Sequence, residues 1–259
     1  MSDSRPSPVV GCALVTGAGL RIGRAIAVYL ADRGWPVAVH YRNSRDDAKA
    51  VVAEIRRTGG AAELFAADLM DEEQVQGLVP AIADRLGPIA LLINNASIFE
   101  RDSAATATRG SWDRHMEVNL RAPFVLTQQM AAQLPDGTEG NVINLLDQRV
   151  WKLTPAFTSY TLSKHGLWTL TRTLAQALAP RMRINAIGPG PALPNKRQSR
   201  AHFDAQIAAL PLQRGTDTDE ICRCVRFLLE TRSMTGQMIA LDGGQHLSWR
   251  TADIIGVVE

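Results

Sequence analysis

The chain has 259 residues, of which 46% are hydrophobic, and a net charge of +2. This length allows one large α/β domain or two small ones, and so small a charge does not favour a nucleic-acid partner. No apolar run of about 20 residues is present, so we expect no membrane-spanning helix. Residues 1–8 are polar and contain prolines, which predicts a flexible tail rather than a signal peptide.

Three cysteines are an odd number in a chain without a secretion signal. We therefore expect reduced thiols and a cytoplasmic location. Cys222 and Cys224 lie two residues apart on a predicted helix and have no histidine or cysteine partner at ligand spacing. No metal site is expected.

The first motif is a glycine-rich turn between a strand and a helix. An apolar run at residues 9–15 precedes the sequence T-G-A-G-L-R-I-G, and helical periodicity follows over residues 24–33. Gly17 permits a tight turn, and Gly23 permits close packing of the helix on the strand. The free amide groups of such a helix N-terminus bind a pyrophosphate, so this segment predicts a dinucleotide site. Arg21 either places a charge beside the phosphates and the pocket floor or points into solvent.

The second predicted strand, residues 35–41, indicates which dinucleotide is bound. An NAD site often ends this strand with an acid that bonds the ribose 2′-hydroxyl, and no acid is present here. A cation and small donors suit a 2′-phosphate, which favours NADPH. The segment consists of His40, Tyr41, Arg42, Asn43 and Ser44. The alternative is that Arg42 caps a surface turn.

The remaining pattern alternates strands and helices to the end of the chain. Predicted helices cover residues 44–58, 71–86, 112–134, 156–178 and 217–230. Predicted strands cover residues 61–67, 89–93, 141–146, 182–187 and 236–241. The long irregular stretch 188–215 is expected to be a substrate-covering loop. Together these elements predict one doubly wound Rossmann-type α/β domain over residues 9–259, with a central parallel sheet.

A tyrosine and a lysine lie one turn apart on the predicted helix 156–178. Tyr160 and Lys164 share a helix face, and Asp147 ends the preceding strand. A free tyrosine has a pKa near ~10, and a neighbouring cation lowers it. A tyrosine tuned in this way exchanges a proton with a carbonyl, imine or alcohol. By itself the pair is weak evidence, because most tyrosine–lysine pairs at this spacing lie on a solvated helix face.

With these motifs the chain resembles the short-chain dehydrogenase/reductase family over about residues 10–247. Tyr160 and Lys164 match the catalytic pair, and Asn119 matches the asparagine thought to position a water in the proton relay. Two positions depart from the family: Asp147 replaces the usual serine, and Arg21 replaces the middle glycine of T-G-x-x-x-G-x-G. A homotetramer is implied by the resemblance.

The resemblance also implies which residues contact the cofactor. Asp68 matches the acid that bonds the adenine amino group, although the start of the next helix is another role for it. Beyond residues 40–44, the implied contacts are Gly17, Arg21, Ile22, Gly23, Asp68, Leu69, Asn95, Ala96, Ser97, Tyr160, Lys164, Pro189 and Gly190.

Four features together are similar to the pteridine reductase branch: Arg21 in the glycine turn, H-Y-R-N-S after the second strand, N-N-A-S-I-F, and Asp147. In that branch a pterin ring lies between the nicotinamide and the phenylalanine that Phe99 matches. The implied substrate pocket consists of Arg21, Ser97, Phe99, Asp147 and Tyr160. A purely structural core role is the alternative for Phe99.

We therefore expect hydride transfer from NADPH to a pterin, dihydropterin or folate-like ring, with Tyr160 delivering the proton and Asp147 assisting. An ionised Asp147 opposes phenolate formation, and a protonated tyrosine suits reduction. One alternative is a carbonyl reductase of the same family. A non-catalytic NADPH-binding sensor is the alternative from another class.

Overall fold

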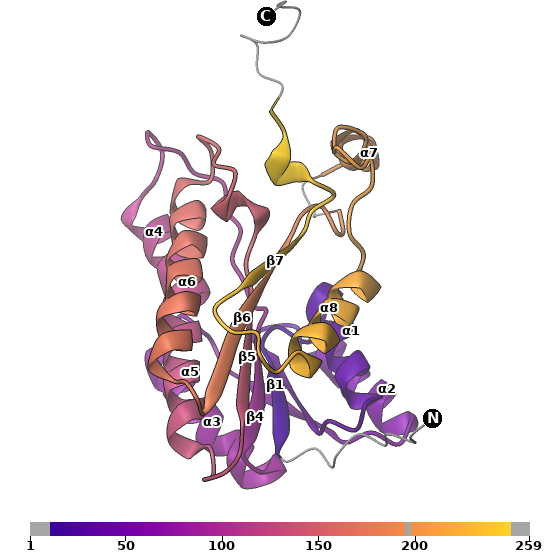
Figure 1. Ribbon diagram of the computed structural model, residues 1–259, viewed down its shortest axis with the longest axis vertical. Coiled ribbons are helices and arrows are strands. Elements are labelled where there is room, and N and C mark those ends of the chain that lie inside the picture. Colours follow the sequence, from indigo (N-terminus) through magenta and orange to yellow (C-terminus); the bar gives the residue numbers. More distant parts are fainter. Residues whose placement is uncertain (1–10, 195–197, 250–259) are drawn as a thin grey trace, which may run out of the picture.

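A computed structural model describes residues 11–194 and 198–249, so the predicted tail at residues 1–8 lies outside the described residues. These residues form one seven-stranded parallel sheet in the order β3-β2-β1-β4-β5-β6-β7 (Figure 1). The strands are β1 (Cys12–Val15), β2 (Val37–Tyr41), β3 (Ala62–Ala66), β4 (Ile89–Asn94), β5 (Gly140–Leu145), β6 (Met182–Pro189) and β7 (Met238–Leu241). The predicted doubly wound α/β fold is confirmed.

Helices cover both faces of the sheet. On one face α1 (Arg21–Ala31), α2 (Arg45–Arg57) and α8 (Thr218–Glu230) pack into one hydrophobic core. On the other face α3 (Glu72–Leu86) and α5 (Ala122–Gln133) pack into a second core, with α4 (Arg109–Met116) and α6 (Thr158–Ala177) on the same side (Figure 1). Because the central strands are buried on both faces, they are mostly apolar rather than alternating. All six residues of β4 are buried.

The strand order reverses between β1 and β4, which run side by side in parallel although β2 and β3 intervene in the chain. Ligands of such sheets bind outside the carboxyl ends of the strands at this switch point. The helix α7 (Arg200–Ala208) and the short turn η3 (Gln245–Leu247) lie beyond that end of the sheet (Figure 1).

The predicted helix at residues 112–134 is wrong in detail. The structure has α4, then a π-helical segment η1 (Glu117–Arg121), then α5. Helix α4 begins earlier than predicted because Thr108 and Ser111 form a capping box. Pro123 has no amide hydrogen, so it cannot donate the α-helical bond to the carbonyl of Asn119, and the helix widens there.

The stretch at residues 188–215 is not irregular throughout, because β6 extends to Pro189 and α7 occupies its middle. Ser199 caps α7 by accepting a hydrogen bond from the amide of His202. Most other element boundaries shift by one to three residues from those predicted. No helix within the described ranges is long and apolar enough to cross a membrane.

Candidate active site

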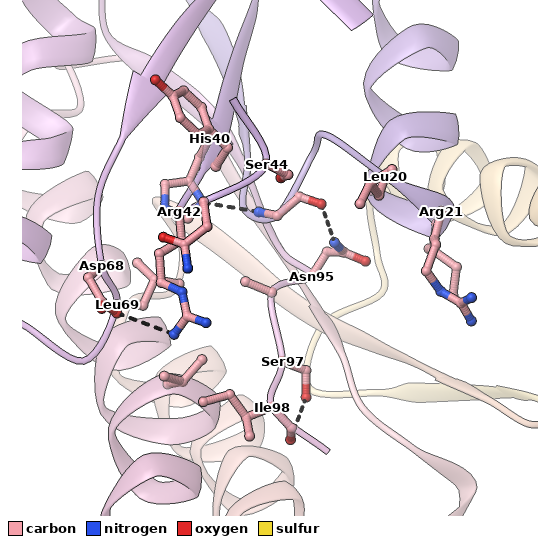
Figure 2. A pocket seen from close by; sticks show the side chains of 17 residues that line it. Leu20, Arg21, His40, Arg42, Ser44, Asp68, Leu69, Asn95, Ser97 and Ile98 are labelled. Carbon is pink, nitrogen blue, oxygen red and sulfur yellow. Dashed lines mark hydrogen bonds and ion pairs between the residues drawn. The ribbon is translucent and has the colours of Figure 1, made fainter. Parts of the chain in front are cut away.

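A cavity of about 630 Å³ opens at the switch point, at the carboxyl ends of β1, β2 and β4 (Figure 2). Most of the predicted cofactor contacts line it. They are Gly17, Arg21, Ile22, Gly23, His40, Tyr41, Arg42, Asn43, Ser44, Asp68, Leu69, Asn95, Ala96 and Ser97. The structure therefore brings together residues from four separate segments of the chain, as the glycine motif predicts.

The glycine turn has a geometry that favours glycine at two positions. Gly17 has a φ of 63°, and a Cβ on Gly23 would lie 2.3 Å from the carbonyl oxygen of Gly17. Asn95 donates from its side chain to the carbonyl of Thr16 at 2.8 Å. The side chain of Asn95 thus fixes the turn from the end of β4.

His40 supports this turn. Its Nδ1 accepts a hydrogen bond from the amide of Gly17 at 3.0 Å, so Nε2 carries the proton and donates to the carbonyl of Ala67 at 3.1 Å. Burial lowers the pKa of His40 to about 4, which keeps the ring neutral. His40 therefore lies on the cavity wall as predicted, but its ring nitrogens are engaged by the protein backbone.

The end of β2 carries the charge that the sequence predicts. The guanidinium of Arg42 lies 3.8 Å from a carboxylate oxygen of Asp68, and both side chains are partly exposed at the cavity (Figure 2). Asp68 also accepts a hydrogen bond from the amide of Met70 at 3.0 Å. The cap of α3 is Asp71 instead, which accepts from the amides of Glu73 and Gln74. Asp68 lies three residues before this cap, and its amide donates to the side chain of Gln74 in α3 at 2.9 Å, so Asp68 both lines the cavity and belongs to the segment that leads into the helix.

Arg21 lies at the border of two cavities, where its side chain is held by backbone carbonyls. Its backbone is left-handed, with a φ of 55°, and its guanidinium donates to the carbonyl oxygens of Leu193 at 3.1 Å and Pro194 at 2.8 Å. The side chain lines the cofactor cavity and a second cavity as well. Arg21 thus connects the glycine turn to the segment that follows β6.

The second cavity, of about 320 Å³, adjoins the first and shares Arg21, Ile22 and Ser97 with it. All five residues predicted for the substrate pocket line this cavity: Arg21, Ser97, Phe99, Asp147 and Tyr160. Pro189 and Gly190, which the resemblance places at the cofactor, line this second cavity in the structure.

Tyr160 and Asp147 form a direct hydrogen bond within this cavity. The Tyr160 hydroxyl donates to Asp147 Oδ2 at 2.9 Å, while Asp147 Oδ1 accepts from the amide of Arg149 at 2.8 Å. Burial raises the pKa of Tyr160 well above its usual value, and the charge and hydrogen bond of Asp147 raise it further; Arg149 partly offsets this. Tyr160 is therefore protonated near neutral pH.

The expectation that Lys164 lowers the pKa of Tyr160 is not met, since Arg149 is the cation that lowers it. Its ammonium donates to the carbonyl of Leu145 at 2.8 Å and lies 5.8 Å from the centre of the Tyr160 ring. Burial lowers the pKa of Lys164 itself to about 8. The pKa of Tyr160 is thus set mainly by burial and by Asp147. The ammonium of Lys164 is held at the end of β5.

The side chain of Asn119 is engaged by the protein on both sides. Its Oδ1 accepts from the amide of Ile98 at 2.8 Å, and its Nδ2 donates to the carbonyl of Ile98 at 3.0 Å and to the Ser163 hydroxyl at 3.0 Å. The hydroxyl of Ser97 also donates to Oδ1, at 3.1 Å. Asn119 therefore ties the loop after β4 to α6, and its part in a proton relay stays a prediction.

Phe99 lies in an aromatic cluster with Tyr160 and with Phe157, which the sequence did not predict to be part of the site. Its ring stacks on Phe157 with centroids 4.4 Å apart and meets Tyr160 edge-on at 4.6 Å. The guanidinium of Arg149 lies 5.1 Å from the Phe157 ring centre and donates to Thr154 at 2.6 Å. Phe99 thus both lines the cavity and packs against neighbouring rings. The sequence signal for Arg149 is its place two residues after Asp147, whereas nothing in the sequence marks Phe157.

Within the described ranges, no group of three histidine, cysteine, aspartate or glutamate side chains could hold a metal ion. Cys222 and Cys224 are both buried on α8. Burial raises the pKa of each thiol to about 12, so both are protonated.

A glycine turn at the switch point lies beside a cavity lined by a protonated tyrosine, and a buried lysine lies one helical turn from that tyrosine. These features define a dinucleotide-dependent oxidoreductase. The enoyl-(acyl carrier protein) reductase family model matches residues 17–246. The chain belongs to this family of short-chain dehydrogenases/reductases.

The chain is similar to reductases of two kinds. The 3-oxoacyl-[acyl-carrier-protein] reductase FabG of Staphylococcus epidermidis is 33% identical over 241 residues, covering 91% of this chain and 98% of its own. FolM alternative dihydrofolate reductase 1 of Brucella canis, complexed with NADP, is 51% identical with a TM-score of 0.93, covering 97% of this chain and all of its own. The Brucella suis FolM, also in complex with NADP, is 52% identical with a TM-score of 0.92, covering 94% of this chain and 98% of its own.

Proposed function

We propose that this protein is an NADPH-dependent reductase that transfers a hydride to a C=N or C=C–N unit of a pterin, dihydropterin or folate-like ring. The observation that carries the proposal is the 2.9 Å hydrogen bond from Tyr160 to Asp147 in a cavity beside the cofactor cavity. The similarity to two FolM alternative dihydrofolate reductases, at 51% and 52% identity, supports it.

The choice of NADPH rests on the cavity wall at the end of β2. Arg42 and Ser44 line this wall, and no acid occurs among residues 42–44. Asp68 lies 3.8 Å from Arg42 and holds the guanidinium near the place where a 2′-phosphate would be recognised. The Brucella FolM structures contain NADP.

The residues of the cofactor cavity fit such a ligand. The N-terminus of α1 supplies free amide groups for a pyrophosphate, and a Cβ at Gly23 would close the turn. Once bound, the nicotinamide supplies the hydride. Lys164 lies on α6, and its buried ammonium at the end of β5 is the cation available to hold the nicotinamide ribose.

Proton delivery falls to Tyr160. Because its pKa is raised, Tyr160 holds its proton near neutrality and can donate it to a ring nitrogen that gains electrons. Each carboxylate oxygen accepts up to two hydrogen bonds, so Asp147 keeps acceptor capacity beyond Tyr160 and the Arg149 amide. An aminopyrimidine offers several N–H donors, which a carboxylate accepts better than a hydroxyl does. Phe99 forms an apolar wall of the same cavity.

A carbonyl reductase is the second candidate, because the chain is 33% identical to a 3-oxoacyl-[acyl-carrier-protein] reductase and keeps Asn119, Tyr160 and Lys164. In that case Asp147 would be incidental to the reaction. A protein that binds NADPH without turning over any substrate would correspond to the sensor alternative.

The test is NADPH oxidation by the purified protein with dihydrobiopterin, dihydrofolate, a panel of ketones and a 3-oxoacyl thioester. We expect the highest kcat/KM with a pterin or folate. A higher kcat/KM with a ketone or the thioester would favour the carbonyl reductase and reject the proposal. We also expect a homotetramer, which sedimentation velocity would test, and a cytoplasmic location, which cell fractionation would test.

A further inference from the structure

Three buried polar side chains form a connected group behind the active-site tyrosine. Asp102 follows β4, His115 lies on α4, and Ser159 lies on α6 next to Tyr160. Their exposed fractions are 3%, 0% and 0%. Buried polar groups are costly unless their hydrogen bonds are satisfied, so a fully connected group of this kind specifies one arrangement.

The hydrogen bonds run in one direction through the group. His115 Nε2 accepts from the amide of Glu100 at 3.1 Å, so Nδ1 carries the proton and donates to the Ser159 hydroxyl at 2.7 Å. The Ser159 hydroxyl in turn donates to Asp102 Oδ2. The amide of Ser159 donates to Asp102 Oδ1 at 3.2 Å.

This arrangement is not that of a nucleophilic triad. In such a triad the histidine accepts the serine proton, whereas here the Ser159 proton points to Asp102 and His115 donates. The serine is also fully buried. The group therefore acts on its neighbours rather than on a substrate.

Those neighbours are the residues of the substrate cavity. The amide of Phe157 donates to the carbonyl of Asp102 at 2.7 Å, and Phe157 is left-handed, with a φ of 63°. A left-handed backbone is uncommon for a bulky residue and persists only where the surroundings impose it. In this conformation the ring of Phe157 stacks on Phe99. The ring of His115 meets the ring of Tyr160 edge-on at 5.9 Å.

We propose that Asp102, His115 and Ser159 are positioning residues that set where Tyr160 and the Phe99–Phe157 pair lie in the substrate cavity. The group joins the segment after β4, which carries Phe99, to the first turn of α6, which carries Tyr160. This inference rests on the proposed function only in that Tyr160 delivers the proton. It does not depend on which ring is reduced.

Kinetics of three variants and one matched control test the role. Ser159→Ala removes the central hydroxyl, His115→Phe removes both ring nitrogens, and His115→Asn keeps a donor at the position of Nδ1. We expect the first two to lower kcat/KM about 10- to 100-fold, mainly through kcat, because small misplacements of reacting groups cost up to about 100-fold. The NADPH dissociation constant should stay within twofold, and His115→Asn should keep more activity than His115→Phe.

The matched control is Ser103→Ala, which removes a hydroxyl that bonds Thr106 within the adjoining exposed loop. It should behave like the native protein. If Ser159→Ala and His115→Phe both stay within twofold of native kcat/KM, the proposal is overturned. A parallel loss of NADPH affinity and folded protein, with no rescue by His115→Asn, would show a role in folding alone and would also overturn it.

A spectroscopic measurement needs no substrate. The chain has three tyrosines, so ¹³Cζ-tyrosine labelling gives three NMR signals, and Tyr160→Phe assigns one of them. We expect the Tyr160 signal to move or broaden in Ser159→Ala and to stay in place in Ser103→Ala. An unchanged signal in Ser159→Ala would overturn the proposal. If the native protein reduces none of the tested compounds, the proposed function fails while this measurement still decides the positioning role.

Discussion

Replacing Asp147 with serine or asparagine tests the most informative departure from the family pattern. Asp147 Oδ2 accepts the Tyr160 hydroxyl at 2.9 Å, and Oδ1 accepts the Arg149 amide at 2.8 Å at the start of the short helix η2 (Gln148–Val150). Serine and asparagine are both good caps, so either substitution preserves this helix start. Asp147→Asn removes the charge and keeps the shape, whereas Asp147→Ser restores the hydroxyl that the family usually has.

The expected magnitude follows from the contacts that are lost. A hydrogen bond to a charged group contributes about 1.5–3 kcal/mol, which corresponds to roughly 10- to 150-fold in rate if Asp147 only holds Tyr160. If Asp147 also binds the aminopyrimidine and assists protonation, the loss in pterin turnover should reach about 10²–10⁴-fold. A loss well above about 150-fold therefore indicates a direct role, because a supporting hydrogen bond alone does not account for it.

The assay is steady-state turnover of the native protein and both variants, on one pterin and one ketone, across pH. Asp147 raises the pKa of Tyr160, so its removal should favour the phenolate. Ketone reduction, or alcohol oxidation at high pH, should survive or rise in Asp147→Ser because the hydroxyl can bond a carbonyl oxygen. The NADPH dissociation constant serves as the control for an intact cofactor cavity.

Two results would refute this reasoning. Equal pterin reduction by all three proteins would remove Asp147 from the mechanism, and the pteridine-reductase hypothesis would lose its main support. A loss of ketone reduction that matches the loss of pterin reduction would show that Asp147 maintains the site without recognising the pterin.

Four further predictions concern cofactor choice, stacking and pH. Arg42→Ala should weaken NADPH binding by roughly 1.5–3 kcal/mol and leave NADH unchanged; equal native affinities for both would contradict this. Phe99→Ala should raise KM for pterins with NADPH affinity intact, whereas unfolded protein would show a purely structural role. Since the pKa of Lys164 is about 8, kcat/KM should fall as the pH rises through about 8, where the ammonium loses its charge. The pKa of His40 is lowered from 6.5 to about 4 in the folded protein. The unfolded state therefore binds a proton first, and the free energy of unfolding should fall by about 3 kcal/mol as the pH falls from 6.5 to 4. Denaturant titrations across this pH range should show that fall in the native protein and not in His40→Gln.

The fold was largely predictable because a buried parallel sheet leaves a strong signal. Apolar runs bounded by glycine or polar residues predicted all seven strands, including β4, which is buried throughout. The widened helix turn at Asn119 was missed because its cause is a missing amide at Pro123, which periodicity does not register. Helix α7 was missed because none of its residues is buried, so its sequence carries little apolar pattern.

The candidate site was predictable where its residues follow strand ends. Asp147 and Asp68 fall at such ends, and the parallel sheet brings these ends to one edge. The contacts of Ser159 with Asp102, 57 residues away, depend on how α6 packs against the loop after β4, which no local pattern reveals. The direction in which the pKa of Tyr160 shifts could likewise not be predicted from the sequence, because burial affects it more than any neighbouring charge does.

Arg21 shows how one departure from the family pattern joins the two cavities. A left-handed backbone costs a non-glycine residue roughly 1–2 kcal/mol, and glycine would avoid this cost. The hydrogen bonds to the carbonyls of Leu193 and Pro194 offset it. A guanidinium has five N–H donors, so it can hold these carbonyls and still meet an anion at the start of α1. Because Leu193 lines the substrate cavity, Arg21 makes the shape of that cavity depend on the turn that receives the cofactor.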